Sequence, residues 1–165
     1  MAVLQSDPDK VVKFFKKKKN KDVLSRINLT KYMIMAVNKL DCDVASTLMA
    51  YGADPNEVDA KTERSPLFHA LQHGVGSLKI LEKMVQNPRH PADFMKAGNK
   101  YGFSTLQLAS ADETGGPEMA TFVLKHALDP KALILAREGK GETALDFAVQ
   151  NNSAELVELF MSYGV

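Results

Sequence analysis

The chain has one cysteine, Cys42, and no tryptophan among its 165 residues. A single cysteine excludes an internal disulfide and a zinc site built from cysteines, which fits a reducing compartment. Long apolar runs are also missing, since no stretch approaches the roughly 20 apolar residues of a membrane-spanning helix. The first residues, MAVLQSDPDK, lack the basic region and apolar core of a signal peptide. We therefore expect no cleaved signal peptide and a cytoplasmic protein, with the nucleus as the alternative location.

Charge is distributed unevenly, although the formal net charge is only +1. Residues 1–30 hold eight Lys or Arg and three Asp or Glu, whereas residues 31–165 hold thirteen and seventeen. The composition, 45% hydrophobic and 25% charged, is typical of soluble globular proteins, and the length favours one or two domains. A basic leader thus precedes a mildly acidic body.

A pattern recurs along this body. In GETALDFAV, SPLFHALQHG and GFSTLQLAS, a hydroxyl residue is followed by an apolar residue two places later and by an alanine five places later. Aligned on the hydroxyl or its equivalent, the copies begin at Lys31, Ser65, Ser104 and Thr143, at intervals of 34, 39 and 39 residues. A period of this length indicates stacked supersecondary units.

Each copy has the pattern of two helices joined by a tight turn. In the last copy, Leu145, Ala148 and Val149 form one apolar stripe at helical spacing, residues 156–160 form a second, and an Asn-Asn pair lies between them. The first copy, KYMIMAVNKLDCDVASTLMAYGADPN, repeats this arrangement. The sequence therefore predicts a helix, a turn and a helix in each unit.

These stretches resemble the ankyrin repeat family. YGADPNEVD is similar to the family's glycine-alanine-aspartate-x-asparagine turn, and the three copies quoted above are similar to its glycine-x-threonine-proline-leucine-histidine helix start. Only the second copy keeps the proline, at Pro66, and Lys31 replaces the threonine of the first. The resemblance implies an all-α ankyrin-repeat solenoid of about four helix-turn-helix units with hairpin fingers, at approximately 30–57, 58–97, 98–136 and 137–165.

Other segments depart from a regular repeat. We expect the insertions NPRHPADFMKAGNK and ADETGGPEMA to form loops outside the helical stack. The apolar run LDPKALILAREGKGE replaces the usual turn and predicts an extra helical turn. Residues 1–29, with Ser6 or Asp7 as N-cap and Pro8 in the first turn, predict a basic helical cap over the first repeat.

Candidate catalytic groups are scarce. His69 and His73 have the spacing of two zinc ligands on a helix, but the glutamate of the metalloprotease motif HExxH is missing. The GKG at residues 139–141 lacks the spacing of a phosphate-binding loop. We therefore expect no enzyme, no cofactor and no metal site. An enzyme that uses His69 and His73 as metal ligands is the least favoured hypothesis.

A basic patch in the leader has three interpretations. The lysines form a solvated face at the end of the preceding helix, a nuclear-localisation or acidic-partner patch, or a contact to anionic membrane or nonspecific nucleic acid. No aromatic residues interleave with them, so we expect no sequence-specific nucleic-acid recognition. The alternative function is that this leader targets a passive repeat stack to the nucleus or an anionic membrane. The patch consists of Lys16, Lys17, Lys18, Lys19 and Lys21.

The resemblance implies a protein partner, whose identity the sequence does not give, and we expect the chain itself to be a monomer. Ankyrin-repeat proteins bind partners through their fingers and the ends of their inner helices, which together form a concave surface. By resemblance, the partner-binding positions are Asn38, Lys39, Thr62, Arg64, Gln72, His73, Tyr101, Phe103, Ala111, Asp112, Lys140, Glu142, Gln150 and Asn151.

Two aromatic residues stand out among these positions. Tyr101 and Phe103 flank Gly102 at one finger, and Arg64 lies on the finger before it. Exposed aromatic and Arg side chains are the usual hot spots of protein interfaces. The alternative is that Phe103 folds beneath the insertion that starts at Asn87 and forms local core.

Overall fold

The computed structural model describes Lys10, Lys13 and residues 28–96, 103–111, 115–137 and 141–165. These residues form nine α-helices and one short 3₁₀ helix, and no β-strand occurs among them. The all-helical class predicted from the sequence is thus confirmed for this part of the chain. The predicted N-terminal cap lies outside the described residues, apart from Lys10 and Lys13.

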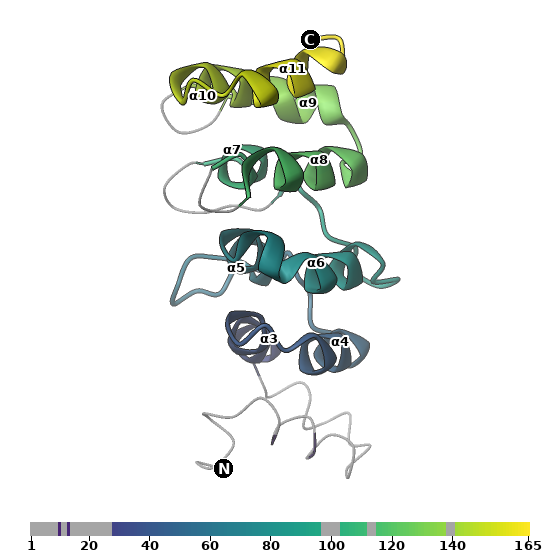
Figure 1. Cartoon of the computed structure of the whole chain (residues 1–165). Coiled ribbons are helices and arrows are strands. Elements are labelled where there is room, and N and C mark those ends of the chain that lie inside the picture. The colour runs from purple at the N-terminus through teal and green to yellow at the C-terminus, as the bar shows by residue number, and fades with distance from the viewer. Residues whose placement is uncertain (1–9, 11–12, 14–27, 97–102, 112–114, 138–140) are drawn as a thin grey trace.

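Consecutive helices pack in pairs, and the pairs are stacked along the molecule (Figure 1). The pairs are α3 (Leu29–Asn38) with α4 (Cys42–Ala50), α5 (Pro66–Gln72) with α6 (Leu78–Val85), α7 (Thr105–Ala109) with α8 (Gly116–His126), and α10 (Ala144–Gln150) with α11 (Ala154–Ser162). Along the stack, α3 contacts α5, α5 contacts α7 and α7 contacts α10, while α4 contacts α6 and α8 contacts α11. We call α3, α5, α7 and α10 the first-helix row, and α4, α6, α8 and α11 the second-helix row.

Two short helices complete the connections. The 3₁₀ helix η2 (Gly74–Ser77) joins α5 to α6, and α9 (Pro130–Leu135) packs against α8 and α10. The extra helical turn predicted in the run LDPKALILAREGKGE is thus found at Pro130–Leu135. Its helix starts where the Asp129 carboxylate accepts a hydrogen bond from the backbone N–H of Ala132 at 3.0 Å, with Pro130 in the first turn.

Hydroxyl side chains begin three helices of the first-helix row. Ser65, Ser104 and Thr143 are N-caps, and each accepts a hydrogen bond from the backbone N–H three residues later. In α7 and α10 the side chains of Gln107 and Asp146 bond back to the N-cap backbone and complete a capping box. These starts match the hydroxyl positions of the repeat.

Lys31, which aligns with these hydroxyl residues, is not an N-cap. Helix α3 begins at Leu29, because the side chain of Asn28 accepts a hydrogen bond from the Lys31 backbone N–H at 2.9 Å and caps the helix earlier. At the other end of the pairs, Gly52 follows the C-cap of α4 with φ +104°, and Gly164 follows the C-cap of α11 with φ +74°.

One apolar core runs through all the pairs, because each pair buries side chains against the next. The alanine of the repeat pattern is 0% exposed in every copy, where its small side chain lets neighbouring helices approach closely: Ala36, Ala70, Ala109 and Ala148. Fully buried large side chains from successive pairs belong to the same apolar cluster as these alanines: Met33, Leu48, Leu71, Leu81, Leu106, Met119, Leu124 and Phe160.

Two expectations about burial were wrong. Phe94, in the first insertion, is only 3% exposed and packs edge-to-face on Phe122, with ring centroids 6.5 Å apart. Its carbonyl also accepts a hydrogen bond from the Thr105 hydroxyl at 2.6 Å, so this part of the insertion belongs to the core. Val149 was predicted as part of an apolar stripe, but it is 62% exposed because it lies on the outer side of the last pair's first helix.

Candidate functional site

The candidate site is built from the segments that precede the first-helix row and from the ends of those helices. We call this surface the finger face. Its exposed or half-buried members are Asn38, Lys39, Thr62, Arg64, Gln72, His73, Phe103, Ala111, Glu142, Gln150 and Asn151. Three further predicted positions lie outside the described residues, as does the basic patch of the leader: Tyr101, Asp112 and Lys140 on the face, and Lys16, Lys17, Lys18, Lys19 and Lys21 in the patch.

The finger before α5 is held by backbone and carboxylate hydrogen bonds. The N–H of Asp59 donates to the carbonyl of Arg64 at 3.1 Å in an isolated antiparallel bridge. The Asp59 carboxylate accepts hydrogen bonds from the backbone N–H groups of Thr62 at 2.9 Å and Lys61 at 3.2 Å. Burial raises the pKa of Asp59, but these hydrogen bonds together outweigh it and hold the pKa below the ordinary 3.8. Thr62 is thereby fixed at an exposed position.

Arg64 lies along α5. Its guanidinium is 5.3 Å from the ring centroid of Phe68, within the range of a cation–π contact, and its NH1 group donates to Gln72 Oε1 at 3.4 Å. The cationic group is thus fixed against the helix on the finger face.

The last unit repeats this arrangement with the opposite charge. Gln150 Nε2 donates to Glu142 Oε1 at 3.0 Å. The separation of eight residues is the same as between Arg64 and Gln72, because each pair joins the residue before an N-cap to the end of a helix about two turns long. The backbone carbonyl of Glu142 also accepts a hydrogen bond from Gln107 Nε2 at 3.0 Å, which links this finger to α7.

The equivalent position in the third unit is Phe103, directly before the N-cap Ser104. Its side chain is 49% exposed, so it does not form local core beneath the insertion. Eight residues later stands the small Ala111 rather than a long polar side chain. An aromatic surface therefore lies between the cationic and anionic units.

The first two units are joined by a polar contact across the face. His73 Nε2 lies 3.2 Å from Asn38 Oδ1, and because an amide oxygen only accepts, Nε2 carries the hydrogen. His73 Nε2 is thus engaged by the side chain of Asn38. No group of three or more His, Cys, Asp or Glu that could hold a metal occurs within the described ranges.

His69 lies beneath this surface. Burial lowers its pKa below the ordinary 6.5, and the neighbouring charges of Arg64 and His73 act in the same direction, whereas Asp59 opposes them. Its Nε2 is buried and has no hydrogen-bond partner in the described part of the chain. The neutral imidazole is therefore the favoured form.

The sequence located individual positions on the face but missed how they pair. The signal was present in the constant separation between residues 64 and 72 and between residues 142 and 150, each of which joins a charged residue to a glutamine. The cation–π contact between Arg64 and Phe68 had no such signal in the sequence, because it depends on how the two side chains are oriented along α5.

Membrane-spanning potential and similarity to known proteins give no further indication of function. None of the helices in the described ranges combines the length and apolar character needed to cross a membrane. A comparison with protein-family models gave no match, and a comparison with curated proteins gave no relative either. The geometry of the finger face is therefore the basis for a functional proposal.

Proposed function

We propose that this chain is a non-enzymatic protein-interaction module of the ankyrin-repeat type, which binds a protein segment on its finger face. Stacked helix pairs, hydroxyl caps on three of the four first helices and a buried alanine in each copy support the ankyrin assignment. Repeat stacks of this kind present a continuous surface to which neighbouring units each contribute side chains.

One observation carries the proposal: equivalent positions on three neighbouring units hold a cation, an aromatic ring and an anion. Arg64, Phe103 and Glu142 each stand immediately before the N-cap of a first helix. Those helices, α5, α7 and α10, contact one another in this order. The residues therefore form a row along the stack, with the exposed ring between the two charges.

The row suggests the chemistry of the partner. An acidic side chain opposite Arg64, an apolar one opposite Phe103 and a basic one opposite Glu142 would complement it, and such charge order fixes the direction of binding. Helices pack about 10 Å apart, so the outer two positions are about 20 Å apart. This distance corresponds to about six residues of an extended segment. We propose an extended peptide segment of this composition.

Replacing Phe103 tests the proposal. Peptides would be selected on the wild-type chain from a displayed random library, and the affinities of enriched sequences would be measured by calorimetry. We expect enriched peptides to contain the acidic, apolar and basic order, and Phe103→Ala to weaken their binding by about 2 kcal/mol, or about thirty-fold, as expected for an aromatic hot spot.

The control is Leu135→Ala, which truncates another apolar side chain of similar exposure, 54%, on α9 away from the finger face. It should leave peptide affinity unchanged. A second arm replaces Lys16 to Lys19 with Gln, which should also leave affinity unchanged if the face, rather than the leader, binds. Peptides that bind the Phe103→Ala variant as tightly as the wild type would refute the site.

A further inference from the structure

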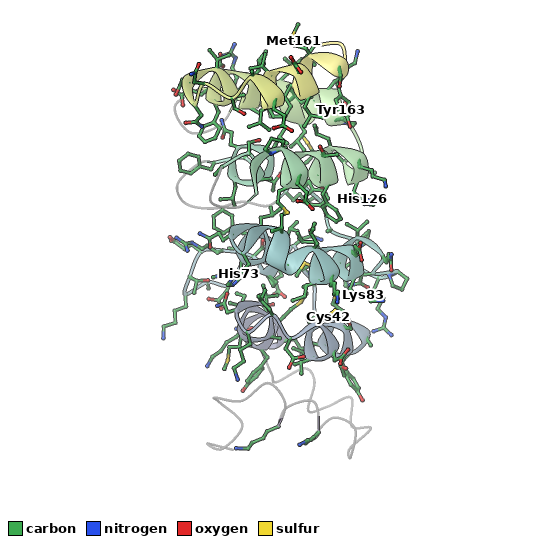
Figure 2. All side chains as sticks on the ribbon, viewed as in Figure 1. Cys42, His73, Lys83, His126, Met161 and Tyr163 are labelled. Atoms are coloured by element: carbon green, nitrogen blue, oxygen red, sulfur yellow. The ribbon has the colours of Figure 1, made fainter. Side chains whose placement is uncertain are left out.

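A pocket of about 320 Å³ lies on the second-helix row, between the ends of α4 and α6. Met49 and Ala50 of α4, Lys83 of α6 and the segment 86–89 after α6 line it. Figure 2 shows Lys83 and His73 at opposite sides of the stack, so the pocket is separate from the finger face. A site here is therefore independent of the proposed function.

The pocket brings together two cations that have no anionic partner among the described residues. Lys83 and Arg89 line it, and both are exposed. Within the described ranges, neither side chain takes part in an ion pair or a hydrogen bond. The guanidinium of Arg89 lies beside Gly52 at the end of α4, where a Cβ would be 3.8 Å from NH1. The two charges thus come from different segments and meet at one pocket.

A buried amide lies in the lining of the same pocket. Asn87 lines the same pocket and is only 6% exposed. Its Oδ1 accepts a hydrogen bond from the Arg89 backbone N–H at 3.2 Å, which fixes the orientation of the amide. The other side, Nδ2, is buried and has no hydrogen-bond partner among the residues that the structure describes. A buried donor without an acceptor is rare in folded proteins and calls for an explanation.

The charge balance and the apolar lining of the pocket together indicate the kind of anion. It lies at the C-terminal ends of α4 and α6, and each helix end carries about half a negative charge. Two such ends offset about one of the two positive charges. The remaining field of about one positive charge still attracts an anion, and the apolar lining, which an aliphatic acid can contact and a phosphate cannot, selects between the two.

We propose that this pocket binds a carboxylate. Arg89 and Lys83 would donate charge-assisted hydrogen bonds to its oxygens, and the Asn87 amide would lie beside the bound carboxylate in the same lining. Met49, Ala50 and Pro88 supply an apolar wall next to these donors. A carboxylate that carries a short aliphatic chain fits both parts, either as a free small acid or as the C-terminus of a peptide.

The experiment titrates the ¹⁵N-labelled chain with propionate and follows the side-chain amide resonance of Asn87. Sodium chloride at equal ionic strength and inorganic phosphate are run in parallel. We expect a saturable shift with propionate that chloride does not produce and that phosphate produces more weakly. Arg89→Gln and Lys83→Gln should each weaken propionate binding about tenfold or more, because each removes a charge-assisted contact.

Lys79→Gln is the matched control, because it makes the same charge change one turn earlier on α6, outside the pocket. It should leave the propionate titration unchanged. A second arm compares an N-acetylated dipeptide acid with its C-terminal amide. Tighter binding of the dipeptide acid than of propionate assigns the pocket to peptide termini, and the reverse order assigns it to free acids.

Three results would overturn the proposal. These are the absence of a saturable shift with every carboxylate, equal weakening by Lys79→Gln and Arg89→Gln, and phosphate binding as tight as that of the carboxylates. None of these results depends on the finger face, so the failure of this site would leave the peptide-binding test untouched.

Discussion

His69 couples the stability of the second helix pair to pH. Because burial lowers its pKa below 6.5, the unfolded chain binds a proton more readily than the folded chain between these two pKa values. The stabilisation is therefore complete above pH 6.5 and decreases as the pH falls toward the pKa of the folded state. The lowered pKa values of Asp59 and Asp146 act only near or below their ordinary 3.8, well outside this range.

We therefore predict that the urea midpoint of the wild-type chain is lower at about pH 5.5 than at about pH 7.5. In His69→Gln the difference between the two midpoints should be smaller, since the group that takes up the proton is gone. The measurement is urea unfolding by circular dichroism at both pH values. Equal pH dependence in the two proteins would show that His69 is not responsible.

The sequence predicted residues whose role is local. Ser65, Ser104 and Thr143 could be identified as helix starts because an N-cap bonds to a backbone group only three residues away. Asn28 was missed because alignment of the copies placed Lys31 at the cap position. In the structure the cap is instead the side chain of Asn28, which accepts a hydrogen bond from the backbone N–H of Lys31. The pKa of His69 could not be predicted, because its burial depends on residues from other segments.

At the scale of the element, the first insertion is partly a structural segment. Phe94 contributes a ring to the core and contacts Phe122 on α8, whereas its neighbour Met95 is 46% exposed. We predict that Phe94→Ala lowers the free energy of unfolding by about 3–5 kcal/mol, the usual cost of truncating a buried phenylalanine. Met95→Ala should change it by less than about 0.5 kcal/mol. Chemical denaturation of both variants checks this.

A small effect of Phe94→Ala, close to that of Met95→Ala, would mean that the insertion is not anchored in the core. The sequence did not predict this anchor because Pro88 and Pro91, shortly before Phe94, are typical of loops. What places Phe94 in the core is a distant ring and the Thr105 hydroxyl, which donates to its carbonyl. Val149 was missed for the opposite reason, since apolar spacing in a seven-residue helix does not say which side is covered.

The whole molecule is a stack in which each pair stabilises the next, so a contact between pairs affects the stability of all of them. Gly115, before α8, has φ +102°, and a Cβ there would lie 2.6 Å from Val75 Cγ1 of the preceding unit. Gly141 has a similar φ of +84°, but no described atom lies within 4 Å of its Cβ position. Comparing alanine substitutions at the two glycines therefore separates the cost of backbone strain from the cost of crowding between helix pairs.

We predict that Gly141→Ala destabilises the chain by about 1 kcal/mol through backbone strain alone, and that Gly115→Ala costs at least about 1 kcal/mol more because of the clash. Adding Val75→Ala to Gly115→Ala should recover part of this extra loss, which a double-mutant cycle of unfolding free energies measures. Equal costs for the two glycine variants, or no recovery, would contradict the crowding between pairs.

The stacked architecture was predictable because it is repeated, and each copy of the pattern supports the others. The finger face was predictable only as a set of positions. Its order of charges depends on which units contact one another, and on Phe103 being exposed rather than folded beneath the insertion.

The contacts between Arg64 and Gln72 and between Glu142 and Gln150 have a consequence for engineering new binders from this chain. In a combinatorial library, randomising a finger residue by itself would leave a glutamine oriented toward a group that is no longer there. Each finger position and its helix-end position eight residues later therefore form one design variable. A library that varies them jointly should yield more well-folded members than one that varies the same number of positions independently.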